Sequence, residues 1–87
     1  MITQEITLKN EEGLHARPAT EIAKNATQYT CSIELDVKGN KYNAKSVLNI
    51  MSAGITNSTQ VTVICNGIDE QKALQGIVQT FEENSLV

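Results

Sequence analysis

Two periodicities alternate along this chain, and they constrain its fold more than any other feature of the sequence. Apolar and polar residues alternate in residues 2–8, 33–37 and 61–63, which is typical of half-buried β-strands, the last of them ending near Cys65. Between and after them, apolar residues recur every three or four positions, which predicts amphipathic helices. A chain of 87 residues can build only one hydrophobic core, so we expect a single domain spanning residues 1–87.

The predicted elements follow the order β-α-β-β-α-β-α. The first strand is followed by a helix of about three turns, which has Pro18 in its first turn and an apolar stripe formed by Ala19, Ile22, Ala23 and Ala26. Gly39-Asn40 is a two-residue hairpin signal between strands 33–37 and 41–44, and Ser46 precedes a short helix that Gly54 ends. After the fourth strand, Asp69 is a good N-cap for a last helix, whose buried stripe is Ala73, Leu74, Ile77, Val78 and Phe81.

Alternating strands imply a sheet with one wet face and one covered face. We therefore expect an α+β open-faced β-sandwich, a four-stranded antiparallel sheet with three helices packed on one face. Gly76 is a weak point of the last helix, because glycine costs about 1 kcal/mol in a helix interior.

Composition excludes several classes of function. The net charge is −3, and two Tyr and one Phe are the only aromatic residues, which argues against nucleic-acid binding. No apolar stretch approaches the roughly 20 residues needed to span a bilayer, and the first residues do not resemble a signal peptide. We therefore expect a cytoplasmic protein without membrane insertion. Cys31 and Cys65 are isolated, so we expect reduced thiols at strand ends, with no zinc site and no disulfide.

Candidate chemistry lies at the start of the first helix, in Gly13-Leu14-His15-Ala16-Arg17-Pro18-Ala19. His15, Arg17 and Pro18 are the only histidine, arginine and proline of the chain. A helix N-terminus offers unpaired N–H groups and a positive dipole end, and Arg17 adds a bidentate cation. Taken singly, His15 and Arg17 are ordinary solvated residues and Pro18 is a routine helix start. Taken together, they indicate a site where phosphate is stabilised beside an imidazole.

The heptapeptide, its distance from the N-terminus, the element order and the later Lys45-Ser46 pair resemble the HPr family over the whole chain. These are the histidine-containing phosphocarrier proteins of the bacterial sugar phosphotransferase system. The resemblance implies that enzyme I, charged from phosphoenolpyruvate, phosphorylates His15 on Nδ1, and that His15 then donates to a histidine of sugar-specific IIA domains. It further implies phosphate binding by the backbone of Ala16 and Arg17, with Pro18 fixing the junction. Such a protein is a monomeric carrier without a cofactor or metal, and not an enzyme.

The segment 47–51 is too short a helix to bury all its apolar side chains. All four of them could lie in the core, but we expect Val47 and Ile50 to face inward and Leu48 and Met51 to protrude. The resemblance places the partner-binding residues here and along the first helix, at Thr20, Lys24, Thr27, Val47, Leu48 and Met51. Glu11 and Glu12 depart from the family pattern by placing two carboxylates near the phosphate.

Ser46 has two compatible interpretations. It is an N-cap, whose replacement by Ala would cost about 1 kcal/mol. In Gram-positive members of the family, the matching serine is phosphorylated by an HPr kinase, which makes the protein a corepressor of a catabolite-control transcription factor. The segment Met51-Ser52-Ala53-Gly54-Ile55 resembles those members more than enteric ones. The alternative to a sugar-transport carrier is therefore a regulatory paralogue, of the nitrogen branch or of catabolite repression; the presence of His15 favours the carrier.

Overall fold

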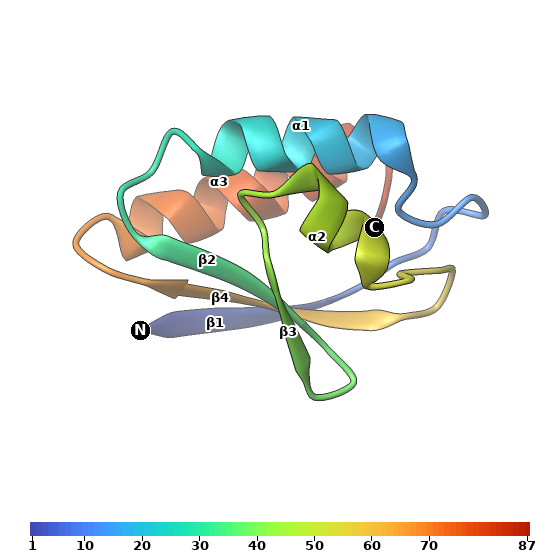
Figure 1. The fold of residues 1–87 in the computed structure, drawn as a ribbon, viewed down its shortest axis with the longest axis horizontal. Helices are drawn as coiled ribbons and strands as arrows, with labels where there is room; N and C mark the ends of the chain where they lie inside the picture. Colours follow the sequence, from blue (N-terminus) through green and yellow to red (C-terminus); the bar gives the residue numbers. More distant parts are fainter.

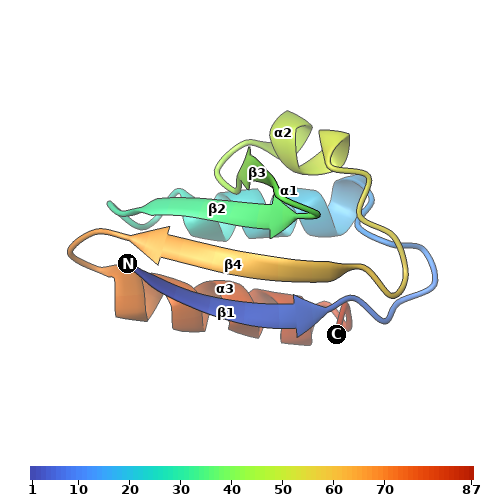
Figure 2. The ribbon, with the colours of Figure 1, turned by 90° about the horizontal axis from the view of Figure 1, so that it is seen from below.

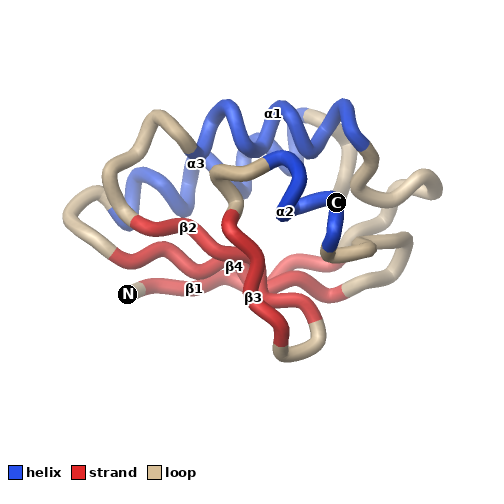
Figure 3. The backbone as a smooth tube through the Cα atoms, in the orientation of Figure 1, coloured by secondary structure: helices blue, strands red, loops and turns tan.

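Three helices cover one face of a four-stranded sheet in the computed structural model, which describes residues 1–87 (Figures 1 and 3). The elements follow in the predicted order, with bounds β1 Ile2–Thr7, α1 Ala16–Ala26, β2 Ser32–Val37, β3 Asn40–Asn43, α2 Val47–Ser52, β4 Gln60–Asn66 and α3 Glu70–Glu83. α1 and α3 lie side by side above the sheet, and the short α2 lies next to α1 (Figure 1). The predicted α+β open-faced sandwich is confirmed.

All strand pairs of the sheet are antiparallel, and the strands lie in the order β1-β4-β2-β3 (Figure 2). β4 is therefore central although it is the last strand of the chain, with Val63 opposite Gln4 on one side and opposite Leu35 on the other. The crossing from β3 at the sheet edge to β4 in its interior is made by α2. This connection brings the loop after α2 next to the loop before α1.

The core lies between the sheet and the helices. Its largest fully buried side chains come from every layer: Phe81, Leu8, Ile22, Ile33, Leu35, Ile50, Ile77, Leu86, Val61, Val63 and Cys65. The alternation predicted from sequence holds in β2, where Ile33, Leu35 and Val37 are buried. Removing the ring of Phe81 would cost ~3–5 kcal/mol, because the packed layers can close the cavity only in part. This core is what holds the start of α1 in place.

The hairpin turn was predicted one residue too late. Val37 pairs with Asn40, so the two turn residues are Lys38 and Gly39, with φ of 55° and 86°. Both central residues of such a turn need positive φ. The backbone N–H of Gly39 donates to the carboxylate of Asp36 at 3.0 Å, which fixes the turn at this register.

The start of α3 also differs from the prediction. Asp69 occupies the N-cap position, but its side chain makes no capping hydrogen bond. Its carboxylate instead accepts the N–H groups of Thr30 and Cys31, at 2.8 and 2.9 Å. Asp69 therefore ties the segment before β2 to the start of α3.

Gly76 is explained by packing. The hydroxyl of Tyr29, between α1 and β2, lies where a Cβ at position 76 would be. The amide nitrogen of Asn25 in α1 donates to the carbonyl of Gly76 at 2.9 Å. Glycine at position 76 lowers the helix propensity of α3, but its missing side chain leaves room for Tyr29 and for the close contact with α1.

Candidate functional site

His15 is the N-cap residue of α1. Its backbone is extended, with φ −89° and ψ −171°, and its carbonyl accepts the N–H of Ala19 at 3.1 Å. The N–H groups of Ala16 and Arg17 come before the first intrahelical bond, and Pro18 has no N–H. No side chain caps the helix, and its first turn contains no acidic residue. Two backbone donors and the positive end of the helix dipole therefore lie beside the imidazole.

The loop before His15 is held against the loop after α2. The N–H of Leu14 donates to the carbonyl of Ile55 at 2.9 Å. Gly13 has a φ of 71°, and a Cβ there would lie 2.6 Å from the same carbonyl oxygen, so no other residue fits without strain. The side-chain amide of Asn10 donates to the carbonyl of Gly13 at 2.8 Å. This close approach fixes the backbone from which His15 projects.

The side chains of His15 and Arg17 project from the surface, whereas Pro18 is buried. The His15 side chain is 45% exposed, and its Nε2 lies 3.5 Å from Oε2 of Glu12. Pro18 has no N–H and is buried in the first turn of α1, so it cannot donate a backbone hydrogen bond to an anion.

The C-terminal residues border the same depression of the surface. It is lined by residues on both sides of the α1 start and by the chain end: Asn10, Glu12, His15, Arg17, Pro18, Glu21, Asn84, Ser85 and Leu86. The N–H of Lys9 donates to the carbonyl of Leu86 at 2.7 Å, and Leu86 itself is buried. Sequence reasoning missed this neighbourhood, because no sequence signal links residues 84–86 to position 15.

The residues expected to bind partners lie on the neighbouring helices α1 and α2. The orientation predicted for α2 is confirmed: Ile50 is buried and Val47 packs against the core, whereas Leu48 is 81% and Met51 43% exposed. Thr20, Lys24 and Thr27 are exposed on or just after α1. The hydroxyls of both threonines donate to carbonyls of their own helix.

Ser46 caps α2 as predicted. Its Oγ accepts the N–H of Asn49 at 3.2 Å. The ammonium group of the neighbouring Lys45 donates to the carbonyl of Tyr29 at 2.8 Å, so it already has a hydrogen-bond partner in its own chain. Lys24 on α1 is exposed and makes no ion pair.

Cys31 and Cys65 are free and buried, and they lie at the same end of the neighbouring strands β2 and β4. Burial, with the nearby Cys31 thiol and the carboxylate of Glu70, raises the pKa of Cys65 to about 11. Burial is also the main cause that raises the pKa of Cys31. Both therefore remain thiols at neutral pH.

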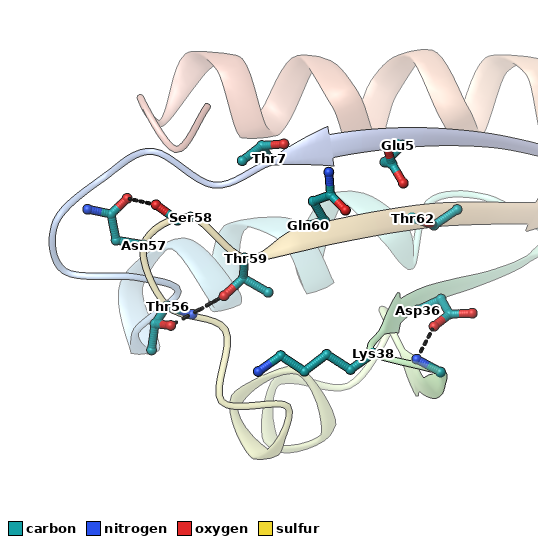
Figure 4. A pocket seen from close by; sticks show the side chains of 11 residues that line it. Glu5, Thr7, Asp36, Lys38, Thr56, Asn57, Ser58, Thr59, Gln60 and Thr62 are labelled. Atoms are coloured by element: carbon teal, nitrogen blue, oxygen red, sulfur yellow. Dashed lines mark hydrogen bonds between the residues drawn. The ribbon is translucent and has the colours of Figure 1, made fainter.

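A polar hollow lies on the uncovered face of the sheet, at the ends of β1, β2 and β4 (Figure 4). Its lining contains no hydrophobic residue and no histidine or cysteine. No group of three or more His, Cys, Asp or Glu residues is placed to hold a metal ion. None of the three helices has the length and hydrophobicity that crossing a membrane requires.

Comparison with known proteins identifies the family. The family described as the PTS HPr component phosphorylation site matches residues 2–83. The chain belongs to the HPr family. Members of this family are phosphocarriers, not catalysts, and the whole fold described above is that of an HPr protein.

Individual HPr relatives resemble the chain over nearly its full length. The histidine-containing phosphocarrier protein of Mycoplasma is 31% identical, with a TM-score of 0.97 over 99% of this chain and 98% of that one. HPr of Thermoanaerobacter tengcongensis is 35% identical, with a TM-score of 0.89 over 95% and 93%. The HPr-like protein Crh of Bacillus subtilis is 36% identical over 95% of this chain and 98% of its own length. A crystal structure of Crh, a catabolite repression protein, shows a domain-swapped dimer, with a TM-score of 0.75 over 95% of each chain.

Proposed function

We propose that this protein is a phosphoryl carrier of the phosphoenolpyruvate-dependent sugar phosphotransferase system. His15 accepts a phosphoryl group from enzyme I and donates it to sugar-specific IIA domains. The observation that carries the proposal is the only histidine of the chain at an uncapped helix start, beside the N–H groups of Ala16 and Arg17. Membership of the HPr family supplies the reaction class.

Transfer to His15 needs positioning and charge stabilisation more than covalent chemistry from the protein. In the proposed step, the lone pair of Nδ1 attacks phosphorus in line with the bond to the donor. The two backbone N–H groups and the Arg17 guanidinium stabilise the three phosphoryl oxygens. The exposure of His15 suits a carrier, because both donor and acceptor must reach the ring.

The exposed side chains of Leu48 and Met51 on α2, together with Lys24 on the neighbouring helix α1, are the proposed docking surface for these partners. Leu48 and Met51 are three residues apart on one short helix, so their side chains lie on the same face, and contiguous apolar patches mark interaction sites. Lys24 would add charge complementarity to an acidic partner surface. We expect the carrier to act as a cytoplasmic monomer.

The direct test is phosphoryl transfer with purified proteins. The chain is incubated with labelled phosphoenolpyruvate and a general enzyme I, and the acid-labile phosphoryl group is measured. Wild type should be labelled stoichiometrically, whereas His15→Ala should take up no label and melt at the same temperature, since the His15 side chain caps nothing. Labelling of His15→Ala, or none of wild type, would refute the proposal.

A second candidate function is regulation, and the similarity to Crh favours it. In this function an HPr kinase phosphorylates Ser46, and the product acts as a corepressor with a catabolite-control transcription factor. Ser46 is half-buried at the start of α2, next to the exposed Leu48. Incubation with an HPr kinase and ATP should give one acid-stable phosphate in wild type and none in Ser46→Ala. If, in addition, wild type takes no label on His15 in the assay with enzyme I and phosphoenolpyruvate, the protein is regulatory only.

A further inference from the structure

Glu12 provides the only ionised side chain within ion-pair distance of His15. Its Oε2 lies 3.5 Å from Nε2 of the imidazole, and the side chains of both residues are largely exposed, 79% for Glu12 and 45% for His15. The distance is too long for a strong hydrogen bond, so the interaction is mainly electrostatic. The carboxylate of Glu12 lies near Nε2 of the imidazole, and Nδ1 makes no contact with this carboxylate.

We propose that Glu12 is a positioning residue that keeps the proton of the neutral imidazole on Nε2 and leaves the lone pair on Nδ1. The inference rests on the proposed function, in which Nδ1 of His15 accepts the phosphoryl group. A neutral histidine has two tautomers, and the partner of one nitrogen sets which of them dominates. A carboxylate beside Nε2 stabilises the tautomer that carries its N–H there.

The same contact helps the transfer step. The lone pair of Nδ1 forms the N–P bond, while the bond between phosphorus and the donor nitrogen of enzyme I breaks and its electron pair stays on the donor. The imidazole of His15 becomes positively charged, and its proton stays on Nε2, next to Glu12. The negative charge of Glu12 stabilises the positive charge that develops in the ring during transfer, and this lowers the barrier of the transfer step.

The loop geometry places Glu12 for this role. Residues 10–13 form a turn in which the N–H of Gly13 donates to the carbonyl of Asn10 at 3.4 Å and the Asn10 side chain donates back at 2.8 Å. Glu11 belongs to the same turn and is equally exposed, but it makes no ion pair and does not line the depression around His15. The chain therefore contains its own matched control for a loss of one negative charge.

The first test is NMR of ¹⁵N-labelled His15 in the unphosphorylated protein, at about pH 9, where an ordinary histidine is neutral. The ring nitrogen shifts give the ratio of the two tautomers. Because an exposed ion pair is weak, we expect Glu12→Gln to lower the Nε2–H to Nδ1–H ratio by about two- to fivefold. Glu11→Gln should leave the ratio at its wild-type value. A ratio unchanged in Glu12→Gln would overturn the proposal.

The dependence of the tautomer ratio on salt distinguishes an electrostatic role of Glu12 from a purely structural one. At about 1 M salt, where the screening length is about 3 Å, the wild-type ratio should fall toward that of Glu12→Gln, and the variant should respond little. With enzyme I, Glu12→Gln should lower kcat by about two- to fivefold with little change in KM. Glu12→Asp should recover part of the loss. Equal kcat for wild type and Glu12→Gln would contradict the proposal.

These measurements separate the inference from the function on which it rests. The tautomer ratio needs no phosphoryl donor, so it reports on Glu12 even in a protein that accepts no phosphate. If wild type is not phosphorylated, the proposed function fails whatever the ratio. If wild type is phosphorylated and either the tautomer ratio or kcat is the same in Glu12→Gln as in wild type, the inference alone fails.

Discussion

The starts of α1 and α3 differ in the charged side chains that they carry and in what those side chains contact. α3 begins with Asp69 and Glu70, whose carboxylates accept backbone N–H groups of neighbouring segments. Glu70 also forms an ion pair with the N-terminal amine of Met1 at 3.1 Å. α1 begins with His15, makes no side-chain cap and has no acidic residue in its first turn. One start is occupied by the protein's own negative charge, and the other is open to an anion.

The carboxylates at α3 show the effect of this occupation. The N–H of Thr30, followed by that of Cys31, lowers the pKa of Asp69. The N–H of Gly67 and then the N-terminal amine lower the pKa of Glu70. Both groups thus stabilise the fold as anions. The comparison teaches that the carboxylates at the start of α3 stabilise the fold through backbone N–H groups of neighbouring segments, whereas the start of α1 carries no acidic side chain and is where we propose that a phosphoryl group binds.

The largest effect that probes the α1 start should come from Arg17→Ala. Loss of the guanidinium removes a charged donor from the phosphoryl oxygens, so transfer from enzyme I should slow by about 100-fold. The melting temperature should stay within about 1 °C of wild type, because an exposed and unpaired cation contributes little to stability. Stopped-time labelling and thermal melts measure both. Lys72→Ala on α3 is the matched control, and an equal loss there would mean that the effect is only one of net charge.

Giving α1 the kind of start that α3 has should remove its function. Ala16→Asp places a carboxylate in the first turn, where it should stabilise the helix by about 0.3–1 kcal/mol. The same charge repels the incoming phosphoryl group, so the transfer rate should fall by about tenfold. Ala16→Asn has the same shape without the charge and should transfer at nearly the wild-type rate. If both variants transfer alike, the open helix end does not hold the phosphoryl group.

Ser46 at the start of α2 offers an intermediate case, because it is already capped but lies near the docking surface. Ser46→Asp should raise the apparent KM for transfer from enzyme I by about fivefold, because its negative charge is desolvated in an apolar contact and is repelled by the acidic partner surface that receives Lys24. High salt should reduce this difference, and the melting temperature should not fall. Ser46→Ala should leave KM unchanged and cost about 1 kcal/mol of stability. Equal kinetics for wild type and Ser46→Asp would leave Ser46 as a cap alone.

The smallest effect concerns the occupied start of α3 and depends on pH. Because the folded protein lowers the pKa of Asp69, its stabilising effect is present above the ordinary pKa of 3.8 and is lost as pH falls through the lower folded value. Asp69→Asn should therefore lower the melting temperature at pH 7, and its effect should diminish as the pH falls below 3.8. Phosphoryl transfer should not change. A difference in melting temperature that is constant with pH would contradict this account of the carboxylate.

Much of this comparison could be predicted from sequence, and the exceptions have physical causes. Strand alternation, the stripe of α1 and the outward Leu48 and Met51 follow from local periodicity. The hairpin turns at Lys38-Gly39 rather than at Gly39-Asn40, and the hydrogen bond from the N–H of Gly39 to Asp36 fits this register. The glycine signal alone does not say which of the two turn positions Gly39 takes. The role of Asp69 depended on Thr30 and Cys31, 39 and 38 residues away, so no local pattern contained it.

The candidate site divides in the same way. His15, Arg17 and the start of α1 form a continuous segment, so the sequence alone brings them together. The contact of Glu12 with Nε2 depends on how the loop closes at Gly13, and the nearness of residues 84–86 depends on the hydrogen bond from the N–H of Lys9 to the carbonyl of Leu86. Contacts between distant segments require the folded chain.

The most direct test of the open helix end is the ¹H–¹⁵N spectrum of the protein before and after phosphorylation. If the backbone donors of α1 hold the phosphoryl group, the amide protons of Ala16 and Arg17 should shift strongly downfield in the phosphorylated protein. The amide protons of Gln71 and Lys72 in the first turn of α3 should not move. Phosphorylation of His15 without a shift at Ala16 and Arg17 would contradict the account, because the phosphoryl group would then be held by side chains alone.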